Sequence, residues 1–287
     1  MTLLKHIDIC NHWVPGDYSP WYIGNTRQGW LKHDFSETLL QYPELFVSHG
    51  EGLQLAPALD TFESRTSTVQ GLLTELARQE KIPALRNEPF AVRQQWDAPA
   101  LMTLDRGAAG IFGIRGYGVH MNGFVRRGNE LLLWVGRRAE DKLSAPGKLD
   151  HIVAGGQPYG LSLQENLIKE AEEEADISRE LAGKAIPCGM LSYRCEREDG
   201  LRDDHIFCFD LELPESFVPR NIDGEVAGFE LWSAEDVLEN LRETEDFKYN
   251  VALVLLHFMI RHGVLSPDET GYTELVQGLS RIPAEPV

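Results

Sequence analysis

The sequence predicts an α/β (α+β) fold, in which strands stand before and after one well-marked helix that begins near residue 162. Strand-like runs of apolar residues precede this helix, joined by the turn Arg126-Arg-Gly-Asn, and further strand-like and helical patterns follow it. In order, the patterned segments around the helix are residues 119–125, 131–135, 189–195, 205–213, 235–242 and 250–262. This order is a mixed one rather than a repeating strand–helix–strand series, so we expect a mixed sheet.

The helix itself is defined by its first turn and by its two faces. Ser162 is followed three residues later by Glu165, which is the pattern of a capping box. An apolar face is expected for packing, formed by Leu163, Leu167, Ile168 and Ala171. Glu170, Glu173 and Glu174 stand at positions i, i+3 and i+4, which places three carboxylates together on an adjacent face.

These three glutamates carry the chemistry of the chain. Like charges at this spacing repel, and a hard divalent cation such as Mg²⁺ would make the cluster favourable while bridging it to a phosphate. Gly155 and Gly156 precede the helix and allow the backbone to approach a phosphate or a metal closely. Lys169 is placed to orient a carboxylate by ion pairing. The competing interpretation is a solvated acidic face beside a turn.

Composition limits the possible functions. The chain has 287 residues, which favours one large or two modest domains, and a net charge of −18, which argues against a nucleic-acid partner. It contains no uncharged apolar run of about 18 residues, so no membrane association is expected. The first residues lack a signal-peptide core, and the four cysteines match neither a zinc site nor a disulfide framework, so we expect a cytoplasmic protein.

The first third of the chain is less clearly patterned. Residues 62–80 show helical spacing, residues 90–92 suggest a strand, and the glycine-containing stretch 105–116 is a plausible boundary. Residues 1–40 are rich in turns and aromatic side chains, of which Trp21, Tyr22 and Trp30 could stack on a heteroaromatic ring. Core packing is the competing expectation for at least two of them.

Residues 155–177 resemble the Nudix box, Gly-x5-Glu-x7-Arg-Glu-U-x-Glu-Glu-x-Gly-U, where U is a bulky apolar residue. Lys169 takes the Arg position, Glu170 the first helical Glu, and Glu173 and Glu174 the Glu-Glu pair. Three departures stand out: Leu161 replaces the early Glu, Asp176 replaces the late Gly, and the loop counted from Gly156 is one residue short.

The departures resemble one branch of the Nudix superfamily, related to the N-terminal part of a fungal thiamine pyrophosphokinase. The wider match includes Trp134-Val-Gly-Arg-Arg, Pro146-Gly-Lys-Leu-Asp150, Asn221-Ile-Asp-Gly-Glu-Val226 and Phe247-Lys-Tyr-Asn. The resemblance implies a Nudix α/β/α sandwich with a mixed sheet over residues 114–265. It places a small α+β accessory domain before it, over residues 1–113, and a C-terminal helical tail after it, over residues 266–287.

The resemblance also implies the members of the site. The expected metal ligands for Mg²⁺, with Mn²⁺ as a substitute, are Glu170, Glu173, Glu174 and Glu225; the expected catalytic residues are Glu173, Glu174, Lys169 and Glu225. Glu225 stands in Asp223-Gly-Glu-Val, where the competing interpretation is a turn acid and Asp223 is the second choice. Substrate contacts are expected from Gly155, Gly156, Arg137, Arg138 and Lys142, since Arg binds phosphates bidentately. A solvated basic turn is the alternative for the last three. His120 and Asn122 either line a pocket or are structural.

The expected activity is Mg²⁺-dependent hydrolysis of a small-molecule diphosphate linked to an organic group. The resemblance implies thiamine diphosphate or its oxidised analogues as the substrate, giving the monophosphate and phosphate. Two alternatives stay open: a nucleoside or sugar diphosphate pyrophosphatase, for example one acting on ADP-ribose, and a non-catalytic Nudix-fold sensor of a diphosphate ligand. The oligomeric state is open, with a homodimer as one option.

Overall fold

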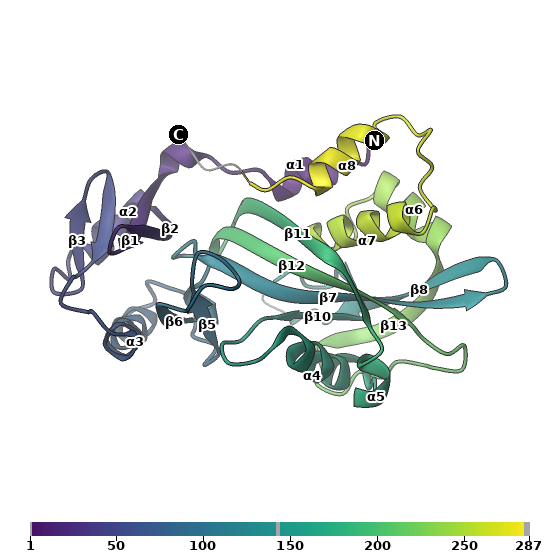
Figure 1. The fold of residues 1–287 in the computed structure, drawn as a ribbon, viewed down its shortest axis with the longest axis horizontal. Helices are drawn as coiled ribbons and strands as arrows, with labels where there is room; N and C mark the ends of the chain where they lie inside the picture. The colour runs from purple at the N-terminus through teal and green to yellow at the C-terminus, as the bar shows by residue number, and fades with distance from the viewer. Residues whose placement is uncertain (1, 142–143, 284–287) are drawn as a thin grey trace.

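A mixed seven-stranded sheet forms the centre of the larger part of the molecule (Figure 1). The structure is a computed structural model that describes residues 2–141 and 144–283. The main path of the sheet runs in the order β11 (Ile186–Arg197), β12 (Gly200–Glu212), β7 (Arg115–Arg127), β8 (Glu130–Arg138) and β13 (Val226–Ser233). Only the β12–β7 pair on this path is parallel; the other pairs are antiparallel, so the predicted mixed sheet is confirmed.

Two short strands extend this sheet next to the predicted site. β10 (Val153–Gly156) pairs with the first half of β7, and β9 (Leu149–Asp150) pairs with the end of β8. Both strands lie in the chain just before the glutamate helix. They therefore bring the glycine loop and Asp150 beside that helix.

Helices cover both faces of the sheet, which gives the expected α/β/α layers (Figure 1). On one face lie α4 (Leu163–Ala175) and the short α5 (Arg179–Ala182), and on the other lie α6 (Ala234–Glu243) and α7 (Tyr249–Arg261). Each face has its own apolar core, one around Val119, Ile152 and Ala171 and the other around Val251, Leu255 and Phe258. Because both faces are covered, β7 is buried along nearly its whole length.

The N-terminal unit runs from η1 (Pro15–Asp17) to η2 (Arg106–Ala108) and has a separate core that includes Trp21, Leu73 and Leu104. Its main sheet has the order β2-β1-β4-β3, and a second sheet pairs β5 with β6. The bounds are β1 (Tyr18–Ile23), β2 (Thr26–Lys32), α2 (His33–Leu39), β3 (Phe46–His49), β4 (Gly52–Leu55), α3 (Phe62–Arg78), β5 (Pro89–Val92) and β6 (Met102–Asp105).

The two terminal helices pack together against the larger part of the molecule. α1 (Lys5–Cys10) contacts α7 and α8 (Tyr272–Leu279), and Leu3, Ile7 and Leu275 join the same core as α7. Residues 5–10, expected within the accessory domain, thus pack with the layers around the seven-stranded sheet. The segment expected as a C-terminal tail contains α8, which contacts α1 and α7. None of the helices in the described residues is long and apolar enough to cross a membrane.

Segments with a clear apolar pattern form the helices and strands expected of them, whereas several strands with a weak pattern were not predicted. The helix expected over 62–80 is α3, the strand at 90–92 is β5, and the helix at 250–262 is α7. Residues 1–40, expected to be turn-rich, contain β1, β2 and α2 as well. These strands are short, with a bulge between Trp21 and Tyr22 and tight turns such as Gly24 at φ 57°, so their alternation is hard to see in sequence.

Candidate active site

The glutamate helix α4 is fixed at both ends by local chemistry. The Ser162 hydroxyl accepts the Glu165 N–H at 3.2 Å while the Glu165 carboxylate accepts the Ser162 N–H at 2.9 Å, so the predicted capping box is confirmed. The helix ends at Asp176, which adopts φ 55° and ψ 33°. Asp is one of the few non-glycine residues that tolerate this left-handed conformation, which explains how it replaces the late Gly of the box.

The glycine pair lets the helix lie close to β10. A Cβ atom added to Gly155 would lie 2.3 Å from Cδ of Glu170, and one added to Gly156 would lie 2.7 Å from Cζ of Phe90. Gly155 is therefore the residue that admits the Glu170 carboxyl group, and it takes the role of the first box glycine. Counted from Gly155, five residues precede Leu161, so the loop has its full length and the expected shortening was wrong.

The three glutamates of α4 do not share one environment. Glu174 is buried, and its Oε2 accepts the Ala154 N–H at 2.8 Å. Burial, reinforced by the charge of Glu170, raises the pKa of Glu174 well above its usual range, and burial also raises the pKa of Glu170. Glu173 is exposed and accepts a hydrogen bond from the Lys169 ammonium at 2.7 Å.

Lys169 links the exposed carboxylate to the inner one. Its Nζ lies 3.1 Å from Oε1 of Glu170 and 2.7 Å from Oε2 of Glu173, as its orienting role required. Although partial burial opposes it, these two carboxylates raise the pKa of Lys169. The ammonium remains charged and partly offsets the negative charge of this face.

Glu225 comes to the same neighbourhood from a distant part of the chain. It lies in the exposed turn before β13, where its N–H donates to Oδ1 of Asp223 at 2.8 Å and its carbonyl accepts the Ala139 N–H at 3.0 Å. Its charge contributes to the raised pKa of Glu174. Asp223, the second choice, uses its carboxylate within the turn.

The carboxylates fit a hard divalent cation by their chemistry, because a cation would stabilise two carboxylates whose pKa is raised by burial and by like charge nearby, Glu170 and Glu174. Within residues 2–141 and 144–283, however, no three His, Cys, Asp or Glu side chains are gathered into an arrangement that could hold a metal ion. The ligand set Glu170, Glu173, Glu174 and Glu225 therefore stays a prediction.

The basic residues expected to bind the diphosphate are divided. Arg138 is largely buried and donates to Oδ2 of Asp150 at 2.8 Å, so its charge is already matched. Arg137 is exposed and donates to the Gly147 carbonyl at 3.1 Å. Lys142 lies outside the described residues.

A buried charged cluster beside the glutamates was not assigned from sequence. Burial alone would raise the pKa of Asp150, but the positive charges of Lys248 and Arg138 lower it to about 2. Nζ of Lys248 lies 3.8 Å from Oδ2 of Asp150, burial lowers the pKa of Lys248, and its charge interacts with Glu174. Asp150 ends the motif Pro-Gly-Lys-Leu-Asp and Lys248 is the second residue of Phe-Lys-Tyr-Asn, so both stood in motifs of the sequence without a role attached.

Two histidines complete this cluster. Nδ1 of His120 lies 3.1 Å from Nδ1 of His151, both side chains are buried, and burial lowers the pKa of His151 to about 4. Both rings are therefore neutral at pH 7. Asn122, the other candidate on β7, donates to Asp210 on the neighbouring strand β12 at 2.9 Å and is structural.

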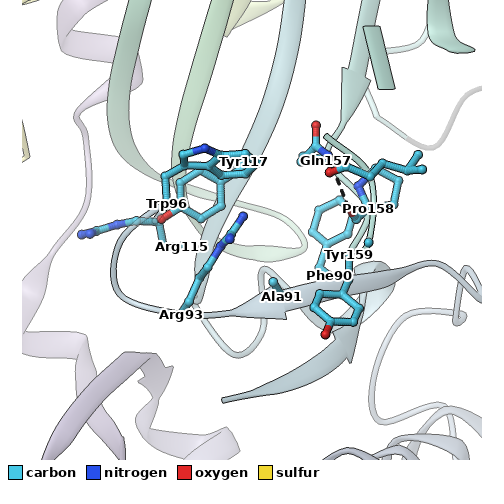
Figure 2. A pocket seen from close by; sticks show the side chains of 11 residues that line it. Phe90, Ala91, Arg93, Trp96, Arg115, Tyr117, Gln157, Pro158 and Tyr159 are labelled. Carbon is cyan, nitrogen blue, oxygen red and sulfur yellow. Dashed lines mark hydrogen bonds between the residues drawn. The ribbon is translucent and has the colours of Figure 1, made fainter. Parts of the chain in front are cut away.

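The N-terminal unit reaches the site through Arg106 and Phe90. Arg106 pairs with Glu88 at 2.7 Å, its Cζ lies 3.6 Å from a Cβ added to Gly156, and its charge acts on Glu170. Of the three rings considered for stacking, Trp21 and Trp30 are instead buried in the N-terminal unit, and Tyr22 packs against His49 of the same unit. The aromatic cavity of the molecule lies elsewhere, between β5, β7 and the loop before α4 (Figure 2).

Comparison with known proteins agrees with this geometry. A family profile described as "Domain of unknown function (DUF4743)" matches residues 2–116. The chain is 40% identical over 280 residues to "Nudix hydrolase 24, chloroplastic" of Arabidopsis thaliana, covering 96% of this chain and 77% of that protein. It is 41% identical over 273 residues to "Nudix hydrolase 20, chloroplastic" of the same plant, covering 92% and 73%.

Among solved structures, the NUDIX domain of Shewanella oneidensis NrtR, complexed with ADP ribose, aligns with 12% identity and a TM-score of 0.42. That alignment covers 52% of this chain and 90% of the other. The layered sheet, the capped glutamate helix and its glycine loop define the class as a Nudix-type diphosphate hydrolase. By its identity to the two plant proteins over nearly its whole length, the chain belongs to the Nudix hydrolase family.

Proposed function

We propose that the protein is a Mg²⁺-dependent hydrolase of a diphosphate joined to an organic group, with thiamine diphosphate or its oxidised analogues as substrates. The observation that carries this proposal is the state of Glu174. Its carboxylate is buried among Glu170, Asp150 and Glu225, and the described residues give it one hydrogen bond, from the Ala154 N–H. A divalent cation would offset the negative charge gathered there. The thiamine assignment rests on the resemblance of the sequence motifs.

The residues divide the work in the proposed reaction. Glu170 and Glu174 would hold the ion together with Glu173 and Glu225. When bound, Mg²⁺ neutralises phosphate charge and lowers the pKa of the attacking water. Lys169 positions Glu170 and Glu173 through its two hydrogen bonds. Lys248 and Arg106 supply positive charge beside the carboxylates, which favours an anionic substrate.

The bond changes are those of a hydrolysis. The water oxygen forms a new bond to phosphorus, the bond between that phosphorus and the bridging oxygen breaks, and Glu173 or Glu225 accepts the water proton. The bridging oxygen leaves on the other phosphate. The products are the monophosphate of the organic group and inorganic phosphate, and charge stabilisation is the main source of catalysis.

The non-catalytic sensor has one observation in its favour. Leu161 stands where the Nudix box has a glutamate, so this position adds no carboxylate to the site. Leu161 instead lines the aromatic cavity. A sensor would bind a diphosphate ligand there without turnover. The pyrophosphatase acting on nucleoside or sugar diphosphates shares the same carboxylates and differs only in the group it recognises.

A substrate panel tests these possibilities. The purified full chain is assayed with Mg²⁺, and separately with Mn²⁺, against thiamine diphosphate, oxothiamine diphosphate, ADP-ribose and nucleoside diphosphates. We expect phosphate release from the thiamine compounds. A higher kcat/KM for ADP-ribose would overturn the thiamine assignment. Absence of turnover with every compound, accompanied by a ligand-induced rise in Tm, would establish the sensor instead.

The partners and location follow from the same proposal. The partner is a small-molecule diphosphate rather than a nucleic acid or a membrane, in keeping with the net charge of −18. We propose a cytoplasmic location. A measurement of the molecular mass in solution would show whether the protein is a homodimer. The two plant relatives are named as chloroplastic, so fractionation of the source cells is the relevant test of location.

A further inference from the structure

A small cavity lies at the junction of the N-terminal unit and the Nudix layers. The N-terminal unit supplies one part of its wall, and β7 with the loop before α4 supplies the rest; the lining residues are Phe90, Ala91, Arg93, Trp96, Arg115, Tyr117, Gln157, Pro158, Tyr159, Gly160 and Leu161. Figure 2 shows Trp96, Tyr117 and Arg93 on one side and Phe90, Pro158 and Tyr159 on the other. The backbone joins the two parts, since the Tyr159 N–H donates to the Pro89 carbonyl at 2.7 Å.

The first wall is a set of aromatic rings that hold one another in place. The Trp96 ring centroid lies 5.2 Å from that of Tyr117 and 5.1 Å from that of Phe207, and the Tyr117 and Phe207 rings are stacked at an angle of 24°. Rings braced in this way lose little further freedom when a flat ligand stacks on them. Trp96 is half-buried, which leaves part of its surface for a ligand.

Three polar atoms in the cavity wall are buried without a hydrogen-bond partner in the described residues. They are Nε of Arg93, the hydroxyl of Tyr117 and Oε1 of Gln157. Such atoms are rare in folded proteins because each loses its hydration without compensation. A nitrogen donor, a hydroxyl and an amide acceptor in one wall are the groups that read the heteroatoms of a ring.

Arg93 also shapes the cavity by its position. Its guanidinium carbon lies 4.1 Å from the Trp96 ring centroid and 5.1 Å from that of Tyr117. Burial lowers the pKa of Arg93, while the aromatic faces beside it attract its positive charge.

The size of the cavity sets the size of the ligand group. Its volume is about 140 Å³. A cavity of roughly 150 Å³ holds one benzene molecule. The space therefore suits one monocyclic ring and is small for a purine with its ribose.

The cavity and the glutamates lie on opposite sides of two consecutive glycines. A Cβ added to Gly156 would strike Phe90 of the cavity wall, and one added to Gly155 would strike the carboxyl group of Glu170. Consecutive Cα atoms are about 3.8 Å apart, so a ring in the cavity is within one small molecule's length of the carboxylates. Leu161 lines the cavity from the same loop.

We propose that this cavity binds a monocyclic heteroaromatic ring of the diphosphate substrate, with Trp96 and Arg93 of the N-terminal unit as its specificity-determining residues. The proposal rests on the proposed function, because it assigns the ring to the same molecule whose diphosphate meets the glutamates. It gives the N-terminal unit a direct part in substrate recognition. Leu161 belongs to this ring site, where a glutamate would place a charge against the ring.

The test compares the full-length chain with Trp96→Ala and Arg93→Gln, and uses Tyr22→Ala as the control. Tyr22 is a half-buried aromatic of the same unit that contacts His49 and lies outside the cavity lining. KM and kcat are measured with Mg²⁺ for thiamine diphosphate and for methyl diphosphate, which has no ring. Binding of thiamine monophosphate is measured by calorimetry, and folding by circular dichroism.

We expect Trp96→Ala to raise KM for thiamine diphosphate roughly 10- to 100-fold, because ring stacking contributes on this scale. The value of kcat should change little, and the kinetics with methyl diphosphate should stay the same. Arg93→Gln should act in the same direction by a smaller factor. Tyr22→Ala should resemble the wild type with both substrates.

The outcomes separate this proposal from the proposed function. An active wild type whose KM for thiamine diphosphate is unchanged in both variants overturns the ring site and leaves the hydrolase intact. An inactive wild type that binds thiamine monophosphate, with binding lost in the variants, overturns the hydrolase and supports the ring site. If Trp96→Ala fails to fold, Arg93→Gln decides, since its side chain is half-buried at the cavity wall.

Discussion

Two buried carboxylates on opposite faces of the same sheet have opposite electrostatic settings. Asp210, on the α7 side, accepts hydrogen bonds from Arg261 at 3.0 Å, His262 at 3.0 Å and Asn122 at 2.9 Å. Burial alone would raise its pKa, but these three partners lower it below the ordinary value. Glu174, on the α4 side, accepts one backbone N–H and has Glu170, Asp150 and Glu225 as charged neighbours, so burial and like charge raise its pKa.

The comparison indicates that Asp210 on the α7 side serves stability, whereas Glu174 on the α4 side serves the chemistry of the site. A buried charge with matched partners stabilises the fold, while a buried charge among like charges opposes folding unless something else binds. On the α7 face, the charge of Asp210 is matched by Arg261 and its other partners. The α4 face has an excess of negative charge, which fits a site completed by a cation. Changes to Glu174, Asp210 and Lys169 test this contrast.

Glu174→Gln should have the largest effect, and it should fall on activity. Removing the charge while keeping the shape takes away a metal ligand and leaves the acceptor for the Ala154 N–H. We expect kcat to fall by about 10²- to 10³-fold or more, with the Tm in the absence of Mg²⁺ unchanged or raised. Steady-state kinetics and thermal melting measure both, with Glu172→Gln on the exposed side of α4 as the control. A variant with near-normal turnover would remove Glu174 from the site.

Asp210→Asn should show the reverse pattern. The neutral side chain leaves the Arg261 guanidinium with weaker partners, so we expect the free energy of unfolding to fall by about 2–3 kcal/mol. Activity at a temperature where the variant is folded should stay near that of the wild type. Urea denaturation provides the measurement, and Glu212→Gln, an exposed change two residues further along β12, provides the control. Unchanged stability would contradict the view of a matched structural cluster.

The stability contributed by Asp210 should depend on pH. Because the folded pKa of Asp210 lies below its ordinary value of 3.8, its stabilising contribution is complete above that value and is lost as pH falls through the folded pKa. The stability difference between wild type and Asp210→Asn should therefore be constant from pH 7 to about 5 and shrink toward pH 3. Denaturation curves across this range test it. A difference that grows on acidification would reverse the assigned sign.

Lys169→Met should give the smallest change in stability. Its side chain is 43% exposed, so removal of the two ion pairs should alter the free energy of unfolding by less than about 1 kcal/mol. Activity should still fall by about tenfold, because Glu170 and Glu173 lose their common partner. Lys184→Met, which removes an exposed pair with Glu180 on α5, is the matched control for charge. Equal kinetics in the two variants would reduce Lys169 to a surface residue.

Much of the fold could be predicted because its signals are local. The capping box of α4, the helix at 250–262 and the hairpin between β7 and β8 depend on residues close in sequence, and all were confirmed. β13 was missed because only its first residue, Val226, is buried and its pattern is weakly alternating. Apart from β5, the strands of the N-terminal unit were missed because they are short and interrupted by turns.

The sequence motif indicated the glutamates of the candidate site, but it did not indicate the residues around them. The motif indicated Glu170, Glu173 and Glu174, yet it did not indicate that Glu174 is buried while Glu173 faces solvent. Lys248 is 98 positions beyond Asp150 in the sequence, and it meets Asp150 only through the layers around the sheet. Trp96 lies in a loop without a recognisable pattern, so its meeting with Tyr117 had no local signal.

The class of fold, the capped glutamate helix, its glycine loop and the chemistry of its carboxylates could all be predicted from the sequence, because they follow from residue type and from spacing along the chain. The tertiary structure alone decided which carboxylates are matched and which are left with excess charge. It also decided that an aromatic cavity joins the N-terminal unit to the site. Burial and the meeting of distant charges depend on how the elements pack, and no single segment of the chain contains that information.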